Sequence, residues 1–140
     1  EIAIFNRDDE FYPRAESTMA KLAKECPACK VTVDKLEDKE KLAAAVEACD
    51  ILVNATSVGM KPQDGISLID TALLRKDLVV ADTVYNPEKT QMILDAEAAG
   101  CAKAIGGAGM LLWQGAVNYE LFTGKVMPVE EYQAFKASQA

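Results

Sequence analysis

Short apolar segments alternate with segments of helical periodicity along the chain, and this alternation restricts the possible folds more than any other feature. The apolar segments have the composition of strands and are residues 2–6 (IAIFN), 30–36 (KVTVDKL), 50–55 (DILVNA), 77–86 (DLVVADTVYN) and 101–105 (CAKAI). Helical patterns cover residues 12–26, 37–49, 87–100, 109–122 and 127–138, with a short helix near 68–74. Strands that alternate with helices in this way form βαβ units. We therefore predict an α/β fold with a doubly wound, mostly parallel sheet and helices on both faces.

Two of these segments carry more specific expectations. The run at residues 50–55 is continuously apolar, which predicts a strand buried on both faces of a parallel sheet. Pro87 is expected to open the helix at 87–100 and Gly100 to close it, because proline suits the first helical turn and glycine the position after the last.

Composition limits the size and the partners of the protein. The chain has 140 residues, half of them hydrophobic, which suits one compact domain over residues 1–140 that ends in a helical segment from about residue 109. The net charge is −7 and there is no run of lysine or arginine, so a nucleic-acid partner is not expected. No apolar run has the length of a membrane span and the first residues lack a signal pattern, so we expect a soluble cytoplasmic domain with no membrane partner.

The four cysteines do not predict a metal site. Cys26 and Cys29 have the spacing of a redox motif or of half a zinc site, but the chain has no histidine to complete the latter. In a thioredoxin-like motif the first cysteine opens a helix, whereas Cys26 closes one. We expect all four cysteines to be reduced and to act as small hydrophobic residues.

Polar or small residues follow four of the predicted strands. In a parallel sheet, ligands bind outside the carboxyl ends of the strands, and these ends meet at one edge. The segments that follow the strands are Asn6 to Asp9, Asn54 to Ser57, Thr83 to Asn86 and Gly106 to Gly109. Their convergence favours a nucleotide site, although strand ends are loops and loops are commonly polar.

The helix after Gly109 carries an amide in an apolar setting. At helical spacing, Met110, Trp113, Val117 and Leu121 form one stripe, and Gln114 lies at its edge. An unpaired buried amide costs about 1–3 kcal/mol, so Gln114 is expected to bind a partner. We expect Met110 and Trp113 to belong to the core.

Four segments, taken in order, resemble the nucleotide-binding domain of the shikimate/quinate dehydrogenase family. They are FNRDDEF (5–11), ILVNATSVGMKP (51–62), DTVYNPEKT (82–90) and GGAGMLLWQGAVNYELFTGK (106–125). The NRDDEF stretch is more similar to the quinate/shikimate branch than to the NADP-dependent biosynthetic branch. The resemblance implies a Rossmann-like fold and an oxidoreductase of the kind that serves aromatic amino acid biosynthesis. Such an enzyme transfers a hydride between NAD or NADP and a ring carbon of shikimate or quinate.

The resemblance also implies roles for the first strand end. Asn6 and Arg7 follow the strand that ends at the adenosine ribose. Arg7 would lie near the adenine, and Asp9 would accept hydrogen bonds from the ribose 2′-hydroxyl. A carboxylate there repels a 2′-phosphate, so NAD is favoured over NADP. Asp8 and Glu10 are expected only to solvate the loop and to suit the start of a helix.

Later strand ends would supply the rest of the cofactor site. The residues implied are Asn54, Thr56 and Ser57 on the ribose and pyrophosphate side, and Thr83, Val84, Tyr85, Asn86 and Gly107 on the nicotinamide side. Gly107 has no side chain, so its carbonyl could approach the nicotinamide carboxamide. Tyr85 has two interpretations: contact with cofactor or substrate, or a half-buried aromatic with a solvated hydroxyl. Gln114 would hydrogen-bond a hydroxyl or carboxylate of the cyclic acid, since an amide both donates and accepts.

The resemblance places two parts of such an enzyme outside this chain. One is the first strand with its glycine-rich loop, and the other is a substrate domain with a catalytic lysine–aspartate pair. We therefore expect no catalytic residue in this chain and no turnover by it alone. The strand edges at either side of the missing strand would pair directly or be filled by another polypeptide, for instance in a homodimer. The alternative is a non-catalytic adenine-nucleotide-binding or regulatory module on the same fold.

Overall fold

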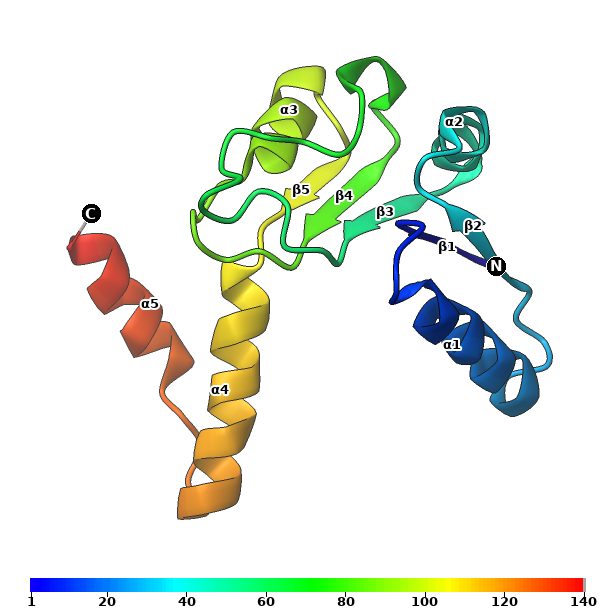
Figure 1. Ribbon diagram of the computed structural model, residues 1–140. Helices are drawn as coiled ribbons and strands as arrows, with labels where there is room; N and C mark the ends of the chain where they lie inside the picture. The colour runs from blue at the N-terminus through cyan, green and yellow to red at the C-terminus, as the bar shows by residue number, and fades with distance from the viewer. Residues whose placement is uncertain (140) are drawn as a thin grey trace. The chain divides into compact units, whose positions relative to one another are not determined.

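The computed structural model describes residues 1–139 and divides into two compact units, Glu1–Cys49 and Asp50–Ala140 (Figure 1). The first unit contains β1 (Ile2–Asn6), α1 (Tyr12–Glu25), β2 (Val31–Lys35) and α2 (Lys39–Ala48). The second contains β3 (Ile51–Asn54), the 3₁₀ helix η1 (Thr71–Leu73), β4 (Val79–Asp82), α3 (Gln91–Ala99), β5 (Lys103–Ile105), α4 (Ala108–Thr123) and α5 (Val129–Ser138).

All strand pairs are parallel, which confirms the predicted α/β fold. β1 pairs with β2 in one sheet, with Asn6 opposite Lys35 at the carboxyl end. The second sheet has the order β3-β4-β5, with Asn54 opposite Asp82. Within residues 1–139, the five strands form two hydrogen-bonded sheets, one in each unit.

In the first unit, each helix forms because its apolar positions recur on one side. α1 has a proline in its first turn and packs against β1 and β2, with Met19 and Leu22 half-buried. α2 begins where the Asp38 carboxylate accepts a hydrogen bond from the backbone N–H of Lys41 at 3.1 Å. Leu42 and Val46, one turn apart on α2, are buried.

In the second unit, α3 covers one face of the sheet by packing against β4 and β5. Val80 is fully buried, and so is Ala96 of α3. Gly100 ends α3 in the left-handed conformation with φ +71°, as predicted. The prediction that Pro87 opens this helix is wrong. α3 begins at Gln91, because Thr90 caps it through its hydroxyl, which accepts from Ile93 N at 3.4 Å.

One face of β3 is exposed. Ile51 and Val53 of β3 are 60% and 54% exposed, whereas Leu52 is half-buried and Asn54 is buried. Side chains alternate between the faces of a strand, and Ile51 and Val53 share the uncovered face of β3. The expectation that this strand is buried on both faces is therefore wrong for this chain.

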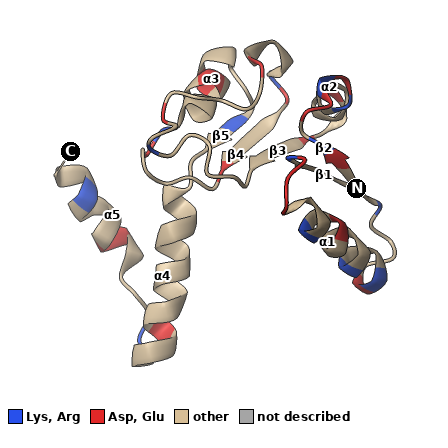
Figure 2. Cartoon of the chain, viewed as in Figure 1, with Lys and Arg blue, Asp and Glu red and all other residues tan. Residues whose placement is uncertain are grey.

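α4 is long, apolar and exposed. Figure 2 shows that α4 is almost without charge, while α1 and α2 carry both signs. Met110 and Trp113 are 55% and 59% exposed, so the expectation that they belong to the core is wrong. No helix among residues 1–139 is long and apolar enough to cross a membrane.

Candidate functional site

Three buried polar side chains meet at the carboxyl ends of β3 and β4. Asn54, Asp82 and Thr90 are 6%, 4% and 1% exposed. Asn54 Nδ2 donates to Asp82 Oδ1 at 3.0 Å, and Thr90 Oγ1 donates to Asp82 Oδ2 at 2.6 Å. The parallel register places Asn54 directly opposite Asp82, and Thr90 reaches them as the cap of α3. These contacts fix the base of the loops that follow both strands.

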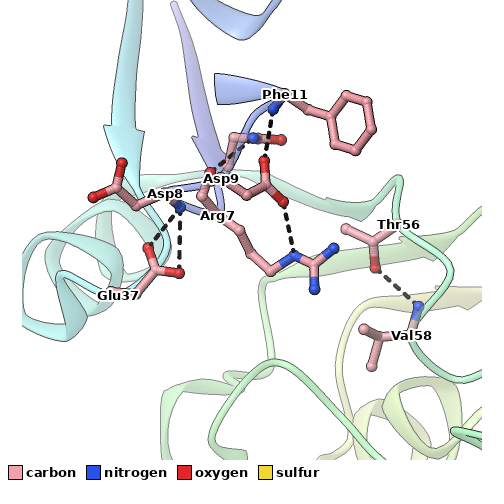
Figure 3. A network of polar contacts seen from close by, with 8 residues as sticks. Arg7, Asp8, Asp9, Phe11, Glu37, Thr56 and Val58 are labelled. Carbon is pink, nitrogen blue, oxygen red and sulfur yellow. Dashed lines mark hydrogen bonds and ion pairs between the residues drawn. The ribbon is translucent and has the colours of Figure 1, made fainter. Parts of the chain in front are cut away.

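The loop after β3 is built on the Asn54 side chain. Thr56 donates to Asn54 Oδ1 from its backbone N–H at 3.0 Å and from its hydroxyl at 2.7 Å. The same hydroxyl accepts a hydrogen bond from Val58 N at 3.1 Å (Figure 3). Asn54 Nδ2 in turn donates to the carbonyl of Val58 at 3.0 Å. Asn54 and the Thr56 hydroxyl are therefore engaged within the protein, while Ser57 is exposed at the tip of the loop.

The loop after β4 lies against the loop after β5. Val84 N donates to Asp82 Oδ1 at 2.9 Å, and Gly107 N donates to the carbonyl of Val84 at 3.1 Å. A Cβ added at Gly107 would lie 2.6 Å from the carbonyl carbon of Thr83 and 2.7 Å from that of Val84. Only glycine fits this approach, so its backbone and that of Thr83 and Val84 form one wall.

An open groove of about 910 Å³ lies beside this wall in the second unit. Its lining includes Tyr85 from the loop after β4, Gly109 and Leu112 from α4, and Tyr132 from α5. Tyr85 is 48% exposed, and Asn86 is also exposed, so both can meet a ligand.

Gln114 is exposed, so the expected burial of its amide is not observed. Its Nε2 donates to the carbonyl of Leu111 at 3.1 Å, and its Oε1 accepts from Asn118 Nδ2 at 3.2 Å. The amide therefore bonds within α4 and faces solvent among apolar neighbours. It keeps further hydrogen-bonding capacity for a ligand, because an amide can make up to four hydrogen bonds.

The loop after β1 has a separate polar network in the first unit (Figure 3). Asp9 Oδ1 accepts from Phe11 N at 3.0 Å, and its other oxygen lies 3.5 Å from Arg7 Nε. Asn6 Nδ2 donates to the carbonyl of Arg7 at 3.0 Å. The Asp9 carboxylate is thus held in place by its own loop, and the Arg7 side chain is largely exposed.

Asp8 does more than solvate this loop. Its carboxylate accepts from Lys35 Nζ at 2.6 Å, and this hydrogen bond raises the pKa of Lys35 above its ordinary value. Its backbone N–H donates to the Glu37 carboxylate at 3.2 and 3.4 Å (Figure 3). The sequence interpretation missed Glu37, although the pairing of Asn6 with Lys35 brings the residues after β2 to this loop.

Residues 1–139 contain no group of three or more side chains suited to a metal ion. Within the same part of the chain, the four cysteines form no disulfide.

Comparison with known proteins identifies the family to which the chain is similar. A family model described as the shikimate 5'-dehydrogenase C-terminal domain matches residues 107–131. Over 131 residues, which are 93% of the chain, it is 47% identical to a quinate/shikimate dehydrogenase of Escherichia coli and 45% identical to a shikimate dehydrogenase (NADP(+)) of Listeria monocytogenes. The chain belongs to the shikimate/quinate dehydrogenase family. It covers 45% and 44% of these two relatives, which is less than half of their length.

Solved structures of this family agree with the fold. A shikimate dehydrogenase from Listeria monocytogenes in complex with shikimate and NAD matches with a TM-score of 0.87 and 42% identity, over 95% of this chain and 46% of that one. A quinate dehydrogenase from Corynebacterium glutamicum in complex with NAD matches with a TM-score of 0.80 and 26% identity, over 97% of this chain and 45% of that one. The shikimate/quinate dehydrogenase family and its Rossmann-like fold, both expected from the sequence motifs, are thereby confirmed.

Within this shikimate/quinate dehydrogenase domain, the structure joins some of the predicted site residues directly. Asn54 and Thr56 bond to each other, and Gly107 lies on Thr83 and Val84. The sequence interpretation missed Asp82 and Thr90. A signal for Asp82 was present, since a carboxylate that ends an apolar strand must find hydrogen-bond donors when the strand is buried.

Proposed function

We propose that this chain is the nucleotide-binding part of a dehydrogenase that transfers a hydride between NAD(P) and a ring carbon of shikimate or quinate. The observation that carries the proposal is the wall formed by Gly107 against Thr83 and Val84. A Cβ at Gly107 has no room there, so the two loops lie directly against one another, and the next residues along them, Tyr85 and Ala108, line the groove. Backbone carbonyl and N–H groups of this kind suit the carboxamide of a nicotinamide ring.

In this proposal the cofactor supplies the hydride chemistry, and this chain binds and orients it. The ribose and pyrophosphate side of the cofactor lies against Asn54, Thr56 and Ser57 in this proposal. The nicotinamide side lies against Thr83 to Asn86 and Gly107. The loop after β1 serves the adenosine, with Asn6 and Arg7 beside Asp9. We assign no residue of this chain to proton transfer. Lys89, for example, is held by Glu97 at 2.8 Å on the surface.

Asp9 is the basis for our proposal that NAD is preferred over NADP. Its carboxylate is oriented by Phe11 N and is only partly neutralised by Arg7 at 3.5 Å. It can accept hydrogen bonds from a 2′-hydroxyl and repels a 2′-phosphate. Asp8, close in sequence, is already paired with Lys35.

Gln114 is proposed to bind the cyclic acid. Its amide is exposed on an apolar helix and presents both a donor and an acceptor, which suits a ring hydroxyl or a carboxylate. Tyr85 is proposed to lie between the two ligands, because its half-exposed ring lines the groove next to the Gly107 wall.

The test measures nucleotide reduction by the natural full-length protein, with shikimate and with quinate, in the presence of NAD or NADP. We expect turnover with at least one acid, and none by residues 1–140 alone. Mixing residues 1–140 with the N-terminal portion of the Escherichia coli relative is expected to restore turnover.

Two outcomes would contradict the proposal in different ways. Turnover by residues 1–140 alone would show that a catalytic group lies in this chain. Tight nucleotide binding by the full-length protein without turnover on either acid would favour the non-catalytic, regulatory module.

A further inference from the structure

Asp82 is a buried carboxylate held by neutral donors. It ends β4 and is 4% exposed. Its Oδ1 accepts from Asn54 Nδ2 at 3.0 Å and from Val84 N at 2.9 Å, and its Oδ2 accepts from Thr90 Oγ1 at 2.6 Å. Burying a carboxylate is costly unless it is hydrogen-bonded, and hydrogen bonds to an ionised acceptor are the strong ones. The chain thus accepts the desolvation cost of a buried carboxylate at a position where an apolar side chain could end β4.

The three donors belong to three different segments. Asn54 ends β3, Val84 lies in the loop after β4, and Thr90 caps α3. One side chain therefore joins two strand ends and the start of a helix. A smaller or uncharged side chain could not hold all three donors with the same strength.

Each of the three residues that bind Asp82 also contacts a loop of the proposed cofactor site. Asn54 Oδ1 holds Thr56 by two hydrogen bonds. The carbonyl of Val84 accepts from Gly107 N at 3.1 Å. Gly59 packs against Thr90, where a Cβ on the glycine would lie 3.2 Å from Thr90 Cβ. The loops after β3, β4 and β5 are thus set by the position of one carboxylate.

We infer that Asp82 is the positioning residue of the nucleotide site, acting through Asn54, Val84 and Thr90 without touching the cofactor. The inference rests on the proposed function, which requires these loops to meet one ligand. Preorganised loops raise affinity because the ligand does not have to order them. Loss of this network should therefore weaken nucleotide binding more than a loss of stability alone would.

The experiment uses the natural full-length protein and five variants. Asp82→Ala removes the acceptor, and Asp82→Asn keeps the shape without the charge. Thr90→Val is isosteric and removes the donor, while Thr90→Ser keeps it. Leu78→Ala is the matched control, because Leu78 is fully buried just before β4, at the opposite end of the strand from the site.

The dissociation constants of NAD and NADP are measured by calorimetry well below the unfolding temperature of every variant, which is recorded by circular dichroism. Asp82→Ala and Thr90→Val should raise the Kd of the bound nucleotide by about tenfold, the size expected when buried partners lose their bonds. Thr90→Ser should restore wild-type affinity, and Asp82→Asn should lie between. Leu78→Ala should lower the unfolding temperature without changing the Kd.

The possible results separate this inference from the proposed function. If the wild-type protein binds neither nucleotide, the proposed function fails, and the inference fails with it. If the wild type binds but Thr90→Val binds equally well, the positioning role of Asp82 is wrong while the function stands, even where Asp82→Ala does not fold. If Leu78→Ala weakens binding as much as Thr90→Val, the network is merely structural.

Discussion

Replacing Gly107 by alanine should destabilise the chain through a steric clash with backbone. Gly107 has φ −71° and ψ −12°, which any residue adopts, so backbone strain is not the cause. The new Cβ would lie 2.6 Å from Thr83 C and 2.7 Å from Val84 C, and nearer still to the Thr83 carbonyl oxygen. No flexible side chain can yield here, so the loops themselves must separate.

The size of the effect follows from these contacts. Overpacking costs about 1–3 kcal/mol, and a clash with three backbone atoms belongs at the upper end of that range. Separation of the loops also strains the hydrogen bond from Gly107 N to Val84 O, which contributes about 1 kcal/mol. We therefore expect Gly107→Ala to lower the free energy of unfolding by about 3–4 kcal/mol.

Two glycines within α4 are matched controls for Gly107, which directly precedes that helix. Gly109 and Gly115 have no atom within 4 Å of an added Cβ. Alanine is a better helix former than glycine, so Gly109→Ala and Gly115→Ala should stabilise the chain by about 0.5–1 kcal/mol each.

Urea unfolding followed by circular dichroism measures all three variants. With a slope of about 2 kcal/mol per M, Gly107→Ala should lower the midpoint by about 1.5–2 M, and each control should raise it by about 0.3–0.5 M. A Gly107→Ala midpoint at or above that of the wild type would refute the steric argument, and with it the Gly107 wall of the proposed site.

Three further predictions concern the polar groups. In the natural full-length protein, Asp9→Ala should raise kcat/KM for NADP relative to NAD about fivefold, the equivalent of one hydrogen bond; a wild-type preference for NADP that persists in the variant would contradict the role of Asp9 beside Arg7. Gln114→Ala should cost about 0.5–1.5 kcal/mol in kcat/KM for the acid and leave the cofactor Kd unchanged, whereas loss of cofactor binding with an unaltered KM for the acid would make Gln114 structural. Asp8→Asn should lower the pKa of Lys35 towards its ordinary value of 10.5, as followed by NMR titration, because the hydrogen bond from Lys35 to Asp8 raises it. This pair stabilises the fold below that value and ceases to do so as the pH rises above it; an unchanged Lys35 titration would show that the pair does not form in solution.

The order of strands and helices could be predicted from the sequence because it depends on local pattern. Alternation of strand and helix fixed the α/β fold with parallel pairing, and Gly100 marked the end of α3. The predicted start of α3 at Pro87 is wrong because the preference of proline for a first helical turn competes with the capping hydroxyl of Thr90, three residues later. A buried threonine that bonds a carboxylate and caps a helix at once outweighs the preference of proline.

Burial could not be predicted in the same way. The run Ile51 to Val53 is as apolar as a fully buried strand, yet Ile51 and Val53 are exposed because β3 is an edge strand of its sheet and α3 packs against β4 and β5. Trp113 is exposed for a similar reason: the apolar stripe of α4 meets no covering element among residues 1–139 that would bury it. The sequence pattern indicates which residues favour burial, whereas the neighbouring helices and strands determine whether those residues are buried.

Asp9 and Asp82 differ in how much of their role in the proposed site could be predicted from the neighbouring sequence. Both are acids at or just after the end of an apolar strand, and the sequence around each is polar on the downstream side. Asp9 is held by Phe11 N, two residues away, so its proposed role could be inferred from its own loop. Asp82 is held by Thr90, eight residues later, and by Asn54, 28 residues earlier, which only the parallel register brings together. Candidate ligand contacts can therefore be proposed from motifs. A residue that sets the position of those contacts becomes visible only once the segments are assembled.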